Sequence, residues 1–206
     1  RFHNPQLSNV EVKDRVKEVM FSVGVDTSWG VRFPHEFSGG QRQRISIARA
    51  LTVEPEFIVA DEPISALDVS IQAQVLNLMM ETQEKRNLTY MFITHDLAVV
   101  EHFGTRVAVM YLGKVCELAA TKTLFDTPKH PYTQALMSAI PRLDDHRPNH
   151  IKLQGEVPTP VNLPSGCVFH GRCPYANERC SQQVPELLAQ SDGSQVACHA
   201  VEEGRI

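Results

Sequence analysis

Two short apolar runs, each followed at once by polar residues and separated by one helical pattern, constrain the fold of this 206-residue chain most strongly. The first run is FIVA (57–60), which leads into DEP (61–63), and the second is YMFI (90–93), which leads into THD (94–96). Between them, residues 69–85 repeat apolar side chains at helical spacing. The pattern predicts two buried parallel strands joined by a right-handed crossover helix, and therefore an α/β fold.

Three polar side chains at the ends of these runs form the first candidate site. Because parallel strands end at the same edge of a sheet, Asp61, Glu62 and His95 should emerge side by side where open α/β sheets bind ligands. Asp61 suits a Mg²⁺ ion, which prefers oxygen ligands and retains waters. Glu62 suits a general base that orients an attacking water in phosphoryl transfer. His95 suits a donor to a γ-phosphate or a holder of that water.

The start of a helix over residues 38–51 forms the second candidate site. Ser38 is a favourable N-cap residue, and Gly39 and Gly40 leave room for a phosphate to approach the backbone. The exposed N–H groups and the dipole of a helix N-terminus both favour an anion. Ser38, Gly39, Gly40 and Gln41 are therefore predicted to contact a phosphate. The arginines that follow on this helix are interpreted as surface and packing residues, namely Arg42, Arg44 and Arg49.

The composition changes after about residue 126. Nine of the 13 prolines lie within residues 128–185, and four of the five cysteines lie within residues 167–198. We therefore expect one domain over residues 1–127 and a loop-rich extension over 128–206, held by something other than a large core. Further elements are expected as helices over 9–23, 97–102 and 132–140 and as β-structure over 107–118.

Four cysteines of this extension are candidate metal ligands: Cys167, Cys173, Cys180 and Cys198. Four thiols in a small proline-rich segment without a secretion signal are explained more readily by a metal centre than by disulfides. Their spacing differs from the short pairs usual for structural zinc, but His170 and His199 keep a zinc site open. Cys116, on an expected strand, is interpreted as a buried core residue.

Composition excludes several classes of protein. With 42% hydrophobic and 21% charged residues, the chain is too apolar to be disordered. A formal net charge of −4 disfavours a nucleic-acid binder, which usually carries a basic excess. No apolar stretch approaches the roughly 20 residues that span a bilayer, and no apolar signal core stands near the first residue. The cytoplasm is the expected compartment.

Taken together, these segments resemble the ATP-binding cassette (ABC) family. FSGGQRQR (37–44) is similar to the family's signature motif, with Phe37 where leucine is commoner, and FIVADEP (57–63) is similar to Walker B. SALD (65–68) is similar to the D-loop, and THD (94–96) to the switch-histidine loop. The resemblance implies a partial P-loop-type nucleotide-binding domain with a helical subdomain and a parallel-sheet core. The D-loop residues it assigns are Ser65, Ala66, Leu67 and Asp68.

In this family two cassettes sandwich two ATP molecules head to tail. The resemblance implies that the signature residues from Ser38 to Gln41 serve an ATP held by a partner cassette. It implies that Asp61, Glu62 and His95 serve an ATP and Mg²⁺ held by this subunit's own P-loop. No P-loop pattern, Q-loop or adenine-stacking aromatic is found in the 206 residues. The chain is therefore expected to be a fragment that lacks the Walker A part and does not hydrolyse ATP by itself.

The extension resembles that of dipeptide and oligopeptide permease ATPases. HPYTQALMSAIPR (130–142) and GCVFHGRC (166–173) carry this narrower resemblance. Similar extensions carry a [4Fe–4S] cluster, so the resemblance implies that the four cysteines hold such a cluster in a structural role, with zinc as the alternative. The segment over residues 155–164 is expected to wrap the α/β body or a second cassette.

The resemblance implies the ATP-hydrolysing subunit of a di- or oligopeptide importer. Its implied partners are a second cassette of different sequence, two transmembrane permease subunits and, indirectly, a substrate-binding protein, at the cytoplasmic face of the plasma membrane. Related importers move nickel or glutathione. A cassette protein that remodels nucleic acid or ribosomes is disfavoured by the acidic charge balance and the tail. A metal-binding module with a degenerate α/β part is disfavoured by the intact Ser38, Glu62 and His95.

Overall fold

The computed structural model describes residues 5–140 and 150–206, and its chain divides into two compact units between His95 and Asp96. The division expected near residue 127 falls instead inside the second unit. The reason is that β4 (Lys114–Ala120) pairs with β6 (Gln195–Val196), so the cysteine-containing tail and the strands before it share one sheet. Pro141 and Arg142, which end the first permease-like segment, lie outside the described residues.

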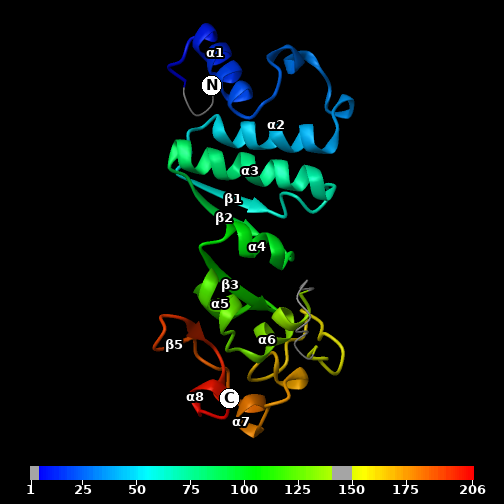
Figure 1. The fold of residues 1–206 in the computed structure, drawn as a ribbon, viewed down its shortest axis with the longest axis vertical. Helices are drawn as coiled ribbons and strands as arrows, with labels where there is room; N and C mark the ends of the chain where they lie inside the picture. The colour runs from blue at the N-terminus through cyan, green and yellow to red at the C-terminus, as the bar shows by residue number, and fades with distance from the viewer. Residues whose placement is uncertain (1–4, 141–149) are drawn as a thin grey trace. The chain divides into compact units, whose positions relative to one another are not determined.

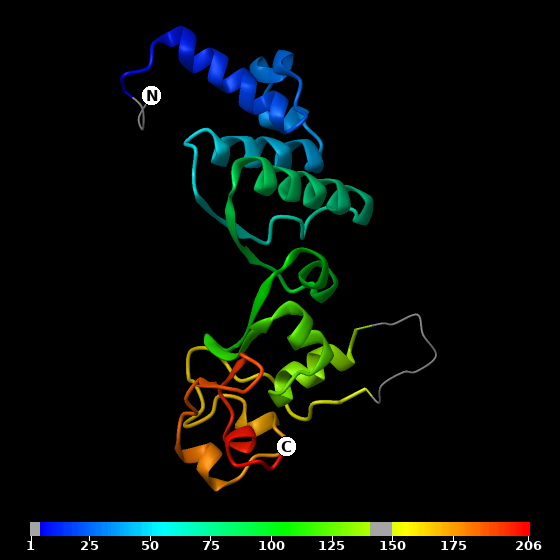
Figure 2. The same cartoon turned by 60° about the vertical axis from the view of Figure 1, so that its left-hand side comes forward.

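The first unit consists of three α-helices, two short 3₁₀ helices and a parallel pair of strands in the described part of the chain. Figures 1 and 2 show α2 and α3 side by side, with α3 lying over one face of the strands. These elements are α1 (Asn9–Ser22), η1 (Thr27–Val31), η2 (Pro34–Glu36), α2 (Gly39–Leu51), β1 (Phe57–Asp61), α3 (Val69–Arg86) and β2 (Thr89–Ile93). The predicted β-α-β unit is confirmed, with each predicted boundary met to within one or two residues.

Local capping explains where the first helix begins. The Ser8 side chain accepts a hydrogen bond from the Glu11 N–H, and the Glu11 carboxylate accepts one from the Ser8 N–H, which forms a capping box. The helix buries Val19 against α2. Arg44 of α2 donates to the Val23 carbonyl, 2.9 Å away, at the end of α1. The interpretation of Arg44 as a packing residue is therefore confirmed.

The two strands pair in parallel with direct register from Phe57 and Thr89 to Asp61 and Ile93. The prediction that both faces of these strands are buried is wrong for this structure. Val59 and Met91 are register partners and are 56% and 52% exposed. The next register pair, Ala60 and Phe92, is buried and half-buried, so only one face of the two strands is covered.

The second unit is built on a four-stranded antiparallel sheet in the order β3-β4-β6-β5. Its elements are α4 (Leu97–Phe103), β3 (Arg106–Tyr111), β4, α5 (Thr121–Asp126), α6 (Pro131–Ser138), η3 (His170–Arg172), α7 (Glu178–Gln182), β5 (Leu188–Ala189), β6 and α8 (His199–Glu202). The short helix expected after residue 96, the β-structure and the later helix are confirmed. No helix in the two described stretches is long and apolar enough to cross a bilayer.

An aromatic cluster around Phe169 forms the core of the tail. Phe169 is 1% exposed, and its ring lies 5.2 Å from Tyr111, 5.4 Å from Tyr132 and 5.7 Å from His130, measured between ring centroids. Cys116 is 3% exposed and packs in the same cluster, as its interpretation as a core residue predicts. The extension is loop-rich, as expected, and it shares this core with residues of β3 and β4.

A buried carboxylate joins β4 to the start of α6. Glu117 is 1% exposed, and its two oxygens accept hydrogen bonds of 2.9 Å from the backbone N–H groups of Lys129 and His130. The His130 side chain then caps α6, because its Nδ1 accepts a hydrogen bond of 3.0 Å from the Tyr132 N–H. An imidazole that accepts at Nδ1 in a buried site carries its proton on Nε2 and is neutral.

The buried His130 predicts a pH-dependent stability. Burial lowers the pKa of His130 from 6.5 to about 4. The unfolded chain therefore binds more protons than the folded chain between these pH values. The contribution of His130 to the free energy of unfolding is complete above pH 6.5 and is lost as the pH falls toward 4. One histidine whose pKa is lowered this far on folding changes the free energy of unfolding by about 3 kcal/mol over this pH range. We expect urea unfolding at a series of pH values to show this loss.

The matched control is His130→Asn, which keeps a side-chain oxygen to cap α6 but does not titrate. Carboxylates that titrate in the same window are common to both proteins and cancel in the comparison. The variant should lose less stability than the wild type between pH 6.5 and 4. Parallel pH profiles for the two proteins would contradict the assignment.

Candidate functional site

The structure brings Glu62 and His95 together at the end of the parallel strands. His95 Nδ1 lies 3.1 Å from Glu62 Oε1, although the residues are 33 positions apart in the sequence. Both side chains remain open to solvent, with exposures of 75% for His95 and 51% for Glu62. The predicted meeting of these two groups is confirmed. An imidazole and a carboxylate at hydrogen-bond distance, facing solvent, can hold a water or a phosphate oxygen between them.

The backbone of Glu62 is held in an unusual conformation. Its φ of 44° is in the left-handed region, where a residue with a Cβ pays roughly 1–3 kcal/mol. Hydrogen bonds on both sides keep it there. The Glu62 N–H donates to the Ile93 carbonyl at 2.9 Å, and the Glu62 carbonyl accepts from the Ser65 N–H and hydroxyl at 3.3 and 3.1 Å. This strain turns the chain sharply at the strand end.

Asp61 is the last residue of β1 and is exposed. Its carboxylate makes no hydrogen bond or ion pair with any other described residue. Oxygen donors of this kind are the ligands that Mg²⁺ takes in proteins, and an unengaged carboxylate beside Glu62 fits that ion. Asp61, Glu62 and His95 thus belong to one edge of the sheet, as the sequence pattern predicts.

Ser38 caps α2 in the manner predicted. Its hydroxyl accepts a hydrogen bond of 3.4 Å from the Gln41 N–H, and the Gln41 side-chain oxygen accepts one of 2.9 Å from the Ser38 N–H. Ser38 and Gly39 are exposed. In the described part of the chain, neither Ser38 nor Gln41 hydrogen-bonds to Glu62 or His95. The two candidate sites are therefore separate in one copy of the chain.

The two glycines after Ser38 serve close packing. A Cβ placed on Gly39 would lie 3.1 Å from Leu67 Cδ2, and a Cβ placed on Gly40 would lie 2.6 Å from Ile71 Cγ2. The start of α2 therefore lies against the loop and first turn that lead into α3. This contact explains why a residue without a Cβ is needed at position 40, which the phosphate interpretation alone does not. It also brings the signature-like segment and the D-loop-like segment together.

Gln72 holds that loop in place. Its amide nitrogen donates to the carbonyls of Ile64 and Leu67 at 3.2 and 3.0 Å. Ser65, Ala66 and Asp68 of the same loop are exposed, and Asp68 precedes α3 as its N-cap residue. Sequence reasoning gives no signal for Gln72, because one amide in the first turn of a helix has no distinctive pattern. Its role appears only from the carbonyls it reaches.

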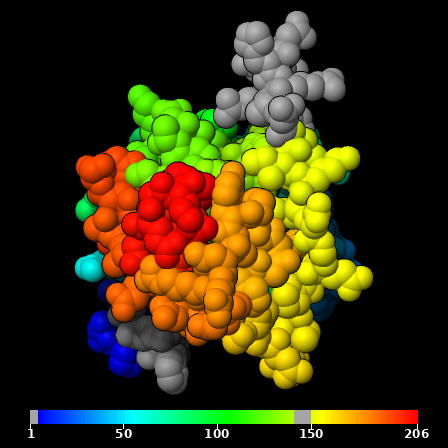
Figure 3. Space-filling view, turned by 90° about the horizontal axis from the view of Figure 1, so that it is seen from below, coloured from blue at the N-terminus to red at the C-terminus, as the bar shows by residue number. Residues whose placement is uncertain are grey.

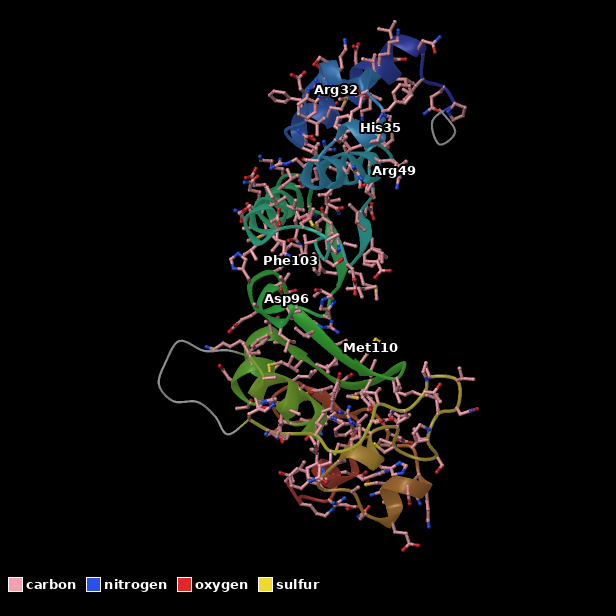
Figure 4. The ribbon with its side chains drawn as sticks, turned by 90° about the vertical axis from the view of Figure 1, so that its right-hand side faces the viewer. Arg32, His35, Arg49, Asp96, Phe103 and Met110 are labelled. Carbon is pink, nitrogen blue, oxygen red and sulfur yellow. The ribbon has the colours of Figure 1, made fainter. Side chains whose placement is uncertain are left out.

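The remaining arginines of α2 behave differently from one another. Arg42 donates from Nε to the Phe37 carbonyl at 2.9 Å, which secures the turn before the helix. Arg49 is exposed, and its guanidinium has no ion-pair or hydrogen-bond partner within the described residues. Figure 4 labels Arg49 on α2, together with Arg32 and His35 of the preceding loop. Arg32 lies over the Trp29 ring at 5.0 Å, a cation–π contact.

The four candidate cysteine ligands lie in the second unit as free thiols. Burial raises the pKa of Cys173 to about 11 and also raises the pKa of Cys167 and Cys198, and the neighbouring cysteines add to each shift. The Cys167 N–H donates to the Cys180 carbonyl at 2.8 Å. Cys167, Cys173 and Cys198 are therefore partly desolvated thiols that lie near other cysteines of this unit.

These cysteines do not form a preassembled ion site. Over residues 5–140 and 150–206, no group of three or more His, Cys, Asp or Glu side chains has an arrangement that could hold a metal ion. The alternative of a four-ligand zinc site that includes His170 or His199 has no geometric support here. His170 Nδ1 lies 2.8 Å from the Cys167 carbonyl, and His199 Nε2 lies 3.0 Å from the Gln183 carbonyl.

Comparisons with known families match both units. Residues 2–65 match the family described as "ABC transporter". Residues 116–180 match the family described as "Oligopeptide/dipeptide transporter, C-terminal region". The first range includes the Ser38 and Glu62 segments, and the second includes Phe169, Tyr132 and His130 of the aromatic core and three of the four candidate cysteines.

Curated relatives are similar over nearly the whole chain. The chain is 56% identical to the oligopeptide transport ATP-binding protein AppF of Bacillus subtilis, over 92% of this chain and 58% of AppF. It is 50% identical to the dipeptide transport ATP-binding protein DppF of Haemophilus influenzae, over 97% of this chain and 61% of DppF. The chain thus spans about three fifths of the length of these relatives.

Solved structures support the fold. The chain is similar to cbiO1 of Clostridium perfringens, part of the ABC transporter complex cbiONQ, with a TM-score of 0.55 and 29% identity over 60% of this chain and 49% of cbiO1. It is similar to MJ1267, an ATP-binding cassette of an ABC transporter in its ADP conformation. There the TM-score is 0.54 and the identity 25%, over 63% of this chain and 51% of MJ1267.

The packing of Gly40 predicts the effect of adding one methyl group. Gly40→Ala should lower the free energy of unfolding by about 1–3 kcal/mol, because the Ile71 methyl is attached directly to Cβ and cannot swing away from a contact of 2.6 Å. The double variant Gly40→Ala/Ile71→Ala should recover part of that loss. Urea unfolding of both single variants and the double variant gives the interaction free energy between positions 40 and 71.

Gly30→Ala is the control for the general effect of replacing glycine. A Cβ at Gly30 meets nothing within 4 Å, so this variant should be as stable as the wild type or slightly more stable. Additive effects of the two changes at Gly40 and Ile71 would show that these residues do not pack as described.

Proposed function

The chain belongs to the ATP-binding cassette family, in the type found in oligopeptide and dipeptide permeases, and from this we propose that it is part of an ATP-hydrolysing subunit of a peptide importer. The observation that supports this most directly is the contact of 3.1 Å between Glu62 Oε1 and His95 Nδ1 at the end of the parallel strands. In such a subunit, hydrolysis of ATP drives the membrane subunits between states.

We propose that Glu62 is the general base. Its carboxylate takes a proton from water while the water oxygen attacks the γ-phosphorus and the bond to the ADP oxygen breaks. His95, which follows the neighbouring strand β2, donates to Glu62 from Nδ1, and with a proton on both ring nitrogens it also donates to a γ-phosphate oxygen from Nε2. Asp61 would hold the Mg²⁺ ion, which neutralises phosphate charge when it is bound. The strained backbone of Glu62 aims its carboxylate out of the sheet.

We propose that the signature segment acts on an ATP held by a second cassette. The exposed Ser38 and Gly39 offer a hydroxyl and a free backbone N–H at the positive end of α2. Gly40 and Gln41 shape that helix start. The D-loop residues Ser65, Ala66, Leu67 and Asp68 lie beside it, and the Gly39–Leu67 contact supports a coupled movement of the two segments.

The partners follow from this assignment. We propose a pair of cassettes, with the second one of different sequence, beneath two transmembrane permease subunits that receive cargo from a substrate-binding protein. The pair would lie at the cytoplasmic face of the membrane. Dipeptides or oligopeptides are the proposed cargo, because AppF and DppF are named for their transport. No nucleic-acid partner is proposed, since the net charge is −4.

We also propose that Cys167, Cys173, Cys180 and Cys198 hold a [4Fe–4S] cluster. The donor set supports this: four free thiols belong to one compact unit. Thiolates are the ligands that such clusters take, and ligation requires that the four thiols lose their protons. The group would serve as a structural crosslink between the segments that carry the cysteines.

Glu62→Gln tests the proposed base. In the assembled importer, it should lower kcat for ATP hydrolysis by roughly 10²–10⁴-fold and leave KM for ATP unchanged, because the carboxylate acts in the transition state. Steady-state hydrolysis by the complex in proteoliposomes measures this. Glu84→Gln, on the exposed side of α3, removes the same charge elsewhere and should retain full activity. Equal rates for the two variants would contradict the role of Glu62.

Metal content tests the proposed cluster. Protein purified without oxygen should contain about four irons and four sulfides per chain, and Cys173→Ser should lose them. Cys116→Ala, a change at the cysteine of the aromatic core, should keep them. One zinc per chain without iron would overturn the cluster and leave the cassette assignment intact.

A further inference from the structure

Gln72, in the first turn of α3, uses both hydrogens of its amide nitrogen on the loop that joins β1 to this helix. The nitrogen donates to the Ile64 carbonyl at 3.2 Å and to the Leu67 carbonyl at 3.0 Å. Among the described residues, no other group donates to the Leu67 carbonyl. One half-buried side chain therefore holds the carbonyls at both ends of residues 64–67.

The near end of this loop is Glu62. The Ser65 N–H and hydroxyl donate to the Glu62 carbonyl, and the Leu67 N–H donates to the Ile64 carbonyl at 3.1 Å. The Ile64 side chain is 3% exposed, which anchors the middle of the loop in the core. Two turns thus follow each other, and the second shares its carbonyl with Gln72. A change in residues 64–67 would disturb the bonds that hold the strained backbone of Glu62.

The far end of the loop packs on the start of α2. Leu67 lies against Gly39, and Ile71, which precedes Gln72 in the same helical turn, lies against Gly40. Ser38 and Glu62 do not hydrogen-bond to each other in the part of the chain that the structure describes. The residues that Gln72 holds therefore provide a packed connection between Glu62 and the signature segment.

Gln74 offers a comparison on the same helix. It is exposed, and its side chain makes no hydrogen bond within the described residues. It has the same chemical groups as Gln72 and stands two positions further along. Substitutions at positions 72 and 74 therefore separate the effect of the two carbonyl contacts from the general effect of replacing a glutamine near the start of α3.

We propose that Gln72 is a positioning residue for ATP hydrolysis: by holding the Ile64 and Leu67 carbonyls, it keeps Glu62 and the signature segment in one arrangement. This inference rests on the proposed function, in which Glu62 acts on one ATP and Ser38 of the same chain contacts the other. The loop then joins the two ATP sites of the pair. Residues that touch neither ligand but lie between two sites change their coupling by about 2–30-fold.

Hydrolysis by the assembled importer in proteoliposomes is the first measurement. Gln72→Leu, which keeps the bulk of the side chain but no N–H donor, should lower kcat about 2–30-fold and leave KM for ATP unchanged. Gln72→Glu, which directs carboxylate oxygens at the same two carbonyls, should lower kcat further. Gln72→Arg restores N–H donors and should keep a higher kcat than Gln72→Leu. Gln74→Leu should match the wild type.

Hydrogen exchange of the same complexes tests the geometry apart from activity. In Gln72→Leu, the amides of residues 64–67 should exchange about 2–10-fold faster than in the wild type, because the carbonyls of this loop lose a donor. The amides of β1 and β2 should exchange at the wild-type rate. Unchanged exchange over residues 64–67 would show that Gln72 does not hold the loop and would overturn its role.

A double variant tests whether Gln72 acts through the general base. If it does, adding Gln72→Leu to Glu62→Gln should cause no further loss of kcat. Full additivity of the two losses would overturn this role of Gln72.

The outcomes separate this inference from the proposed function. A wild-type complex that hydrolyses no ATP, or a Glu62→Gln complex as active as the wild type, overturns the proposed base and the role of Gln72 with it. A Glu62→Gln complex that is inactive beside a Gln72→Leu complex with wild-type kcat overturns the role of Gln72 alone. So does a rise in KM without a change in kcat. If Gln72→Leu does not assemble, equal kcat values for Gln72→Arg and Gln72→Glu overturn the role.

Discussion

The parallel pairing of β1 with β2 is the constraint on which the candidate site depends. Direct register places Asp61 opposite Ile93, so the residues that follow each strand leave the sheet at the same edge. The hydrogen bond from the Glu62 N–H to the Ile93 carbonyl extends this pairing one step beyond the strands. A shift of one residue would turn every side chain to the opposite face and separate Glu62 from His95.

The strain at Glu62 is the consequence of that constraint. A φ of 44° turns the chain at the end of β1, and the Glu62 carboxylate lies in solvent beside His95. Conformations of this cost persist only where the surroundings hold them, and here the Ile93 carbonyl and Ser65 do so. Glycine would adopt this turn freely but would carry no carboxylate. Glu62 therefore combines a strained backbone with the carboxylate of the candidate site.

Sequence reasoning predicted the local elements and the meeting of Glu62 with His95, but it missed other contacts between distant segments. The β-α-β unit and the cap at Ser38 follow from periodicity and capping residues within a few positions. No short sequence pattern indicates the packing of Gly40 against Ile71. The same is true of the hydrogen bonds from the Gln72 amide to backbone carbonyls of the preceding loop. The pairing of β4 with β6 spans about 80 residues and moves the division between compact units to residue 95. Apolar runs in the sequence indicate strands, but they do not show how many faces of the resulting sheet are covered by other elements.

The order of the tail has two separate sources. Sequence composition predicts that a crosslinking centre must supply this order. Phe169, however, is buried among three rings from β3 and the start of α6, and Glu117 secures the start of α6. Burial of one large aromatic side chain contributes about 1.5–3 kcal/mol. The aromatic core therefore positions the Cys167 segment, while the ion pairs of Arg179 with Glu202 and Glu203 join the helix that carries Cys180 to the helix that follows Cys198 (orange and red in Figure 3).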